Sequence, residues 1–136
     1  MHTKDKIIRQ FGITSKYKGY RYLLDAIHIA AENYDECLKV TKDIYPVIAH
    51  KYGVTKVSVE RDIRTVIEKC WDNNKAYLQE LSGCKLSRCP SNSEFIDIIA
   101  QYTGIHKSLK IGSSISIIYQ FTYTFHSFIM VSGVSN

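Results

Sequence analysis

Apolar side chains recur at intervals of three and four residues along most of the chain, and this spacing predicts helices. The first convincing helix extends from about Gly19 to Glu32. Its apolar face consists of Tyr20, Leu23, Leu24, Ile27, Ala30 and Ala31. Asn33 and Glu36 fit a capping box, which predicts a second helix through about Asp43.

The same periodicity continues in the second half of the chain. It predicts a short helix near Lys75 to Leu81 and a last core helix from Ser93 to Tyr102. The segment from Ser91 to Glu94 forms a capping box that opens the last helix, and Gly104 is expected to end it. The pattern as a whole predicts an all-α fold, a compact bundle of about six helices.

The stretch from Ile44 to Trp71 reads as a helix, a tight turn and a second helix. Pro46 falls in the first turn of the first helix, where its missing N–H costs nothing. Gly53 accepts the left-handed conformation of a sharp turn, and Thr55 can cap the next helix. Apolar residues keep a helical spacing in the first helix, at Ile44, Val47, Ile48 and Tyr52. The inward stripe predicted for the second helix consists of Val59, Ile63, Val66 or Ile67, Cys70 and Trp71. The stretch therefore predicts a helix-turn-helix.

The outward face of that second helix has the chemistry of a DNA-reading surface. Arg61 and Arg64 lie three residues apart, so they share a face and can each present a planar fork to guanine. Glu60 can accept a hydrogen bond from a cytosine amino group. The same three residues also suit an ordinary solvated helix face whose charges pair with one another, and the pattern alone leaves both interpretations open.

Composition narrows the choice of function only slightly. The 136 residues suit one domain, and a net charge of +5 favours an anionic partner without selecting nucleic acid. The N-terminus has no secretory signal, so the four cysteines indicate a reducing cytoplasm. Cys84 and Cys89 lack a second matching pair, so a zinc site is disfavoured. Since no phosphate loop, activated nucleophile or metal cluster is visible, we expect no enzyme activity, no cofactor, no metal and no small-molecule substrate.

Four stretches resemble a known family. They are YKGYRYLLDAI, VTKDIYPVIAHKYGVT, VERDIRTVIEKCW and PSNSEFIDIIA, and they occur in the family's order and spacing between about Gly12 and Lys107. The chain resembles the C-terminal effector domain of stage zero sporulation protein A, the sporulation response regulator. This match is much more specific than a generic helix-turn-helix pattern.

The resemblance implies a sequence-specific transcription regulator that binds double-stranded DNA, often at tandem operator boxes and as a dimer on them. It also implies a contact with RNA polymerase sigma factor. The residues expected to read bases are Glu60, Arg61 and Arg64. Those expected to contact the backbone or position the helix are Lys51, Thr55, Lys56, Val57, Ser58 and Lys107, the last of them by resemblance alone.

Several positions depart from the family's pattern. Lys56, Val57 and Ser58 stand where the family usually has small residues or an arginine, and Thr65 stands where it has histidine. Asp62 replaces a common alanine, and its carboxylate lowers the positive potential beside the arginines. These changes keep a second hypothesis open, in which the chain is a receiver-less interaction module that binds sigma factor or a full-length paralogue.

The two ends are expected to lie outside the effector domain, which we place at residues 12–107. Residues 1–11 are predicted to form an N-terminal arm, and nothing there has the pattern of a receiver domain, so control by phosphorylation in cis is not expected. Residues 108–136 form an apolar tail that is uncharged from Ile111 onward. A strand or hairpin and a membrane span are alternatives for it, the span being disfavoured by interspersed Ser and Thr. We favour an unselected or weakly ordered tail.

Overall fold

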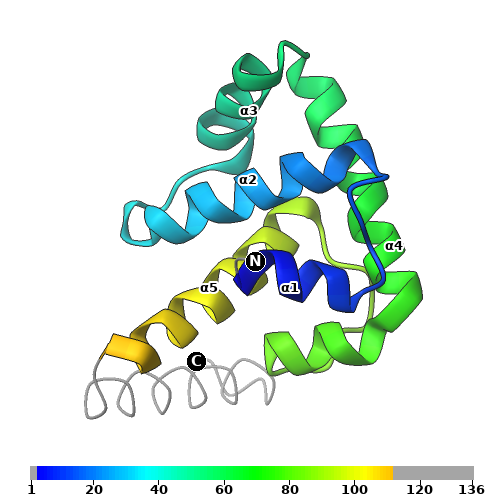
Figure 1. Cartoon of the computed structure of the whole chain (residues 1–136), viewed down its shortest axis with the longest axis vertical. Coiled ribbons are helices and arrows are strands. Elements are labelled where there is room, and N and C mark those ends of the chain that lie inside the picture. The colour runs from blue at the N-terminus through cyan, green and yellow to red at the C-terminus, as the bar shows by residue number, and fades with distance from the viewer. Residues whose placement is uncertain (1–2, 112–136) are drawn as a thin grey trace.

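The computed structural model describes residues 3–111, with side chains described as far as residue 104. This part contains five α-helices and no strand: α1 (Thr3–Gln10), α2 (Lys18–Glu32), α3 (Tyr45–Tyr52), α4 (Lys56–Ser82) and α5 (Asn92–Ile111). A short 3₁₀ segment, η1 (Tyr34–Glu36), and a π-helical turn, η2 (Val40–Ile44), connect α2 to α3. The predicted all-α fold is confirmed, and Figure 1 shows α2 lying between α3 and α5, with α4 running down one side of the molecule.

The hydrophobic core lies where α2, α4 and α5 pack against one another. Its centre contains fully buried side chains such as Leu23, Ile63 and Phe95. The predicted arm, residues 1–11, contains α1, whose Ile7 and Ile8 are buried in this same core. Burial of these apolar side chains is what fixes α1 against the bundle.

One glycine allows α2 to lie directly against α4. A Cβ added at Gly19 would stand 2.1 Å from the backbone oxygen of Asp62, which is much closer than atoms can approach. The first turn of α2 is therefore in backbone contact with the N-terminal half of α4. This contact fixes where the predicted reading helix sits on the bundle.

The helix predicted from Asn33 to Asp43 is wrong as a continuous α-helix. The Asn33 side chain donates to the carbonyl oxygen of Ile29 at 2.8 Å, and so does its backbone N–H at 3.2 Å. The Asn33 side chain therefore caps the end of α2 and makes no cap hydrogen bond to the short 3₁₀ segment that follows. The chain then passes through η1 and a left-handed Cys37, with φ of 52°, before η2 begins.

Two other predicted helices have different limits in the structure. Helix α5 continues through Gly104 to Ile111, because a glycine inside a helix costs only about 1 kcal/mol and does not force it to stop. The predicted helix near 75–81 is the last part of α4, which has one non-helical residue at Asn74. The Asn74 side chain accepts a hydrogen bond from the Tyr77 N–H at 3.1 Å and so caps the second part of α4.

Candidate nucleic-acid interface

The order of helix, glycine turn and capped second helix predicted for residues 44–71 is present in α3 and α4. Gly53 has a left-handed backbone, with φ of 64°, and its N–H bonds the last carbonyls of α3. Thr55 then caps α4, since its hydroxyl oxygen accepts from the Ser58 N–H at 3.1 Å. Within α3, Val47 is 54% exposed, whereas Tyr45, Ile48 and Ala49 are buried.

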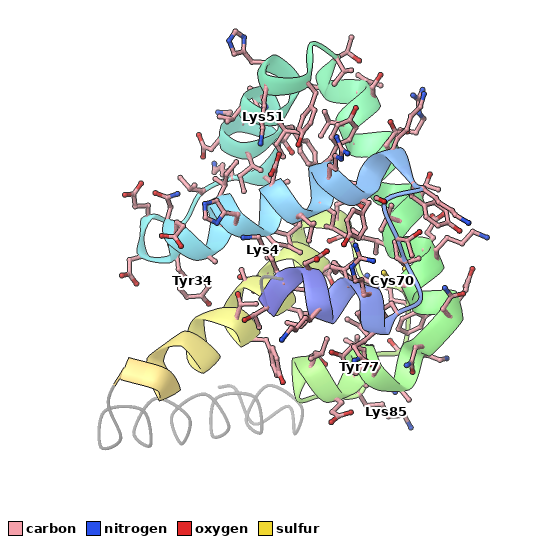
Figure 2. All side chains as sticks on the ribbon, viewed as in Figure 1. Lys4, Tyr34, Lys51, Cys70, Tyr77 and Lys85 are labelled. Atoms are coloured by element: carbon pink, nitrogen blue, oxygen red, sulfur yellow. The ribbon has the colours of Figure 1, made fainter. Side chains whose placement is uncertain are left out.

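The buried stripe of α4 determines which of its side chains point outward. The stripe consists of Val59, Ile63, Val66, Ile67 and Cys70, each of them fully buried. Burial raises the pKa of the Cys70 thiol to about 12, so this cysteine is a protonated core residue inside α4 (Figure 2). The helix cannot rotate without exposing this stripe, and its polar face is fixed as a result.

Three residues predicted to read bases lie together on that polar face. Glu60, Arg61 and Arg64 line one open cleft, together with Val57. The cleft is also lined by Ser91 to Ser93, at and just before the start of α5, and by Thr41 and Tyr45. The structure thus brings the predicted reading residues to the edge of α5, a neighbour that the sequence pattern did not indicate.

Arg61 is the more exposed of the two arginines. Its side chain is 68% exposed, and its Nε lies 3.6 Å from an Asp62 carboxylate oxygen. The Asp62 side chain is itself only 20% exposed, beside the contact with Gly19. Arg61 is consequently able to reach outward with most of its donors facing solvent.

Arg64 is held by the segment that precedes α5. Its Nη1 donates to the Pro90 carbonyl oxygen at 2.7 Å, its Nη2 contacts Cys89 Sγ at 3.0 Å, and its Nε donates to Glu68 at 3.0 Å. Burial by itself lowers the pKa of the guanidinium, but the contacts with Glu68 and Cys89 together raise it by more. The net pKa is raised, so the group is charged. In this structure Arg64 therefore joins α4 to the start of α5.

Asn92 is a buried connection that sequence reasoning missed. Its Nδ2 donates to the Glu60 carbonyl oxygen at 3.1 Å and to the Tyr45 hydroxyl at 3.0 Å. Burial raises the pKa of Tyr45, which keeps this phenol neutral in the contact. The capping box placed Asn92 at a helix start, but no periodicity could indicate that its amide would join three helices.

The lysines predicted to contact phosphate differ in their surroundings. Lys51 Nζ donates to an Asp25 carboxylate oxygen at 2.9 Å, which raises the pKa of the lysine and connects α3 to α2 (Figure 2). The same oxygen accepts from the Tyr52 hydroxyl at 2.7 Å. Lys56 is exposed at the start of α4. Lys107 lies on α5, but its side chain is outside the described part.

Among the described side chains, those of residues 3–104, we find no group of three or more His, Cys, Asp or Glu placed to hold a metal ion. No helix within residues 3–111 has the length and apolar character needed to cross a bilayer. Most of the predicted apolar tail lies outside the described residues, so the structure does not test the interpretations of it.

A family model described as "Sporulation initiation factor Spo0A C terminal" matches residues 5–103, which is most of the chain and includes most of α1, all of α2 to α4 and a little over half of α5.

Proposed function

Since this chain belongs to the sporulation initiation factor Spo0A C-terminal family, we propose that it is a sequence-specific DNA-binding regulator that reads operator boxes with α4. The family is one of sporulation-related DNA-binding effector domains and is not an enzyme family. The observation that carries the proposal is the outward face of α4. Thr55 caps the N-terminus of this helix just after the glycine turn, and Arg61, in its second turn, is mostly exposed.

In the proposed mechanism the first turns of α4 enter the major groove. Side chains near the start of a reading helix face base edges, while the preceding helix, here α3, lies across the phosphate backbone. Arg61 presents its fork to guanine, and Glu60 accepts from a cytosine amino group. Arg64 reads a base only after it releases Pro90 and Cys89, so base reading by this residue is coupled to a rearrangement at the start of α5.

The phosphate contacts are assigned to the ends of the two helices. Lys56, Thr55 and Ser58 lie at the start of α4, where the helix N-terminus also favours an anion. Lys51 lies at the end of α3, and its contact with Asp25 holds the ammonium group in place. Lys107 is assigned to the same role from the family resemblance. Dimers on tandem boxes and a sigma factor contact remain part of the proposal.

The experiment is a selection of duplexes from a random pool, followed by fluorescence anisotropy with the full chain. We expect the selected duplex to bind at least tenfold tighter than a scrambled one, with affinity that falls steeply as salt rises. Arg61→Ala should bind both duplexes with similar weak affinity. Equal binding of the two duplexes by the parent chain contradicts the proposal.

A second candidate function is that of a protein-interaction module. It is supported by the small number of guanidinium donors on the α4 face that are free to bond DNA bases. Arg64 is engaged with the segment before α5, and the carboxylates of Glu60 and Asp62 lie near Arg61. An interaction module that binds sigma factor or a full-length paralogue would tolerate such a face. Partner binding that survives Arg61→Ala and Arg64→Ala, in a chain without duplex preference, would favour this candidate.

A further inference from the structure

Val57 stands out among the side chains of the α4 face. It is 71% exposed, the highest value among the large apolar side chains in the described part of the chain. It is the second residue of α4, three and four residues before Glu60 and Arg61, and it lines the same cleft. A single exposed valine is common on protein surfaces and by itself indicates no function, but this one stands beside the proposed base-reading residues.

We propose that Val57 is a specificity-determining residue that reads a thymine by contact with its C5-methyl group. The inference rests on the proposed function and adds a base to it. The thymine methyl is the apolar group that base pairs display in the major groove, and it is absent from cytosine and from both purines. A valine placed beside base-reading polar groups is complementary to that methyl.

The local structure suits such a contact. Residues near the N-terminus of a reading helix come closest to base edges, and Val57 is in the first turn of α4. A valine in a helix has one strongly preferred χ1 rotamer, so little side-chain entropy is lost when the contact forms. Burying the two valine methyl groups against a base methyl also removes apolar surface from water.

The neighbours of Val57 favour a nucleic acid over an apolar protein surface as its occupant. Arg61 lies one helical turn away with a side chain that is 68% exposed, and Lys56 is adjacent and exposed. An apolar partner that covered Val57 would also desolvate these cations, which is costly unless they are paired. A DNA groove offers the methyl group and the anionic surroundings together.

The test uses the selected duplex with each thymine replaced in turn by uracil, which keeps base pairing and lacks only the methyl group. For the full chain we expect the affinity to fall about three- to fivefold at one thymine, as removal of one buried methyl predicts. Val57→Ala should lose this sensitivity and bind the thymine duplex about as weakly as the parent binds the uracil duplex. Val57→Thr, which keeps the branched shape, should also bind more weakly.

Val47→Ala is the matched control, because Val47 is the next most exposed valine and lies on α3. It should keep the full sensitivity to uracil. If the parent prefers the selected duplex and no single uracil changes its affinity, or if Val57→Ala keeps the same sensitivity, the role of Val57 is overturned and the proposed function stands. Loss of preference for the selected duplex in the parent would overturn both.

Discussion

At the scale of single residues, the two arginines of the α4 face have different surroundings. Arg61 is mostly exposed and makes one long contact with Asp62, whereas Arg64 satisfies donors of all three guanidinium nitrogens within the protein. An exposed cation contributes little to folding, but an arginine that bonds a carbonyl of a buried proline holds structure together. Alanine variants of the two residues should therefore differ in stability, although both should lose duplex binding.

We expect Arg61→Ala to abolish duplex preference and to change the free energy of unfolding by less than about 0.5 kcal/mol. Arg64→Ala should weaken duplex binding and also destabilise the fold by about 1–3 kcal/mol, because the Pro90 carbonyl loses its guanidinium donor and keeps only the long contact with Cys89 Sγ. Arg64→Lys restores the charge without the planar fork and should recover only part of the stability. Urea unfolding and anisotropy check both quantities, and equal stability of the two alanine variants would refute this assignment for Arg64.

Asn92 provides a second residue-scale prediction. Replacing its amide with a carboxylate in Asn92→Asp places an oxygen against the Glu60 carbonyl, which formerly accepted a hydrogen bond. The expected loss is about 1–3 kcal/mol of unfolding free energy, because a buried hydrogen bond is replaced by repulsion. Ser93→Ala, an exposed neighbour, is the control and should be neutral. Similar urea midpoints for the two variants would show that the amide does not connect these helices.

At the scale of elements, the sequence predicted what local chemistry determines. Thr55 and Gly53 delimit the turn between α3 and α4 as expected, since capping and left-handed glycine are local properties. Asn33 shows the limit of such arguments, because its amide can serve the helix before it or the helix after it. The engagement of Arg64 and Asn92 depends on residues more than twenty positions away, and no periodicity carries that information.

The contact between α2 and α4 gives an element-scale prediction with a matched pair of glycines. Gly19→Ala puts a methyl group against backbone atoms of Asp62, so the helices must separate at a cost of about 1–3 kcal/mol or more. Gly104→Ala adds the same methyl group inside α5, where no described atom lies within 4 Å of the added Cβ, and should stabilise the chain by up to about 1 kcal/mol. Urea midpoints that shift in opposite directions are expected, and a shift of the same sign and size would contradict this packing.

At the scale of the whole molecule, the bundle supports the α4 face from several directions. The first turn of α2 packs on the backbone of α4, Asn92 and Arg64 attach the start of α5, and Asp25 attaches the end of α3. The Asn73 amide donates to the Phe11 carbonyl oxygen at 2.9 Å, next to the break in α4, and so connects α1 to the same helix. A face supported in this way meets a rigid partner with little loss of conformational entropy.

The last prediction concerns charge over the whole bound surface. If Lys56 and Lys107 each neutralise one phosphate, replacing either by alanine should weaken binding to selected and scrambled duplexes alike. Each replacement should make the negative slope of log affinity against log salt less steep by about 0.9, since one fewer counterion is released. Arg61→Ala should instead change the ratio between the two duplexes, because a base contact is lost. Anisotropy across a salt series separates these effects, and a lysine variant with an unchanged slope would show that its ammonium group does not reach the backbone.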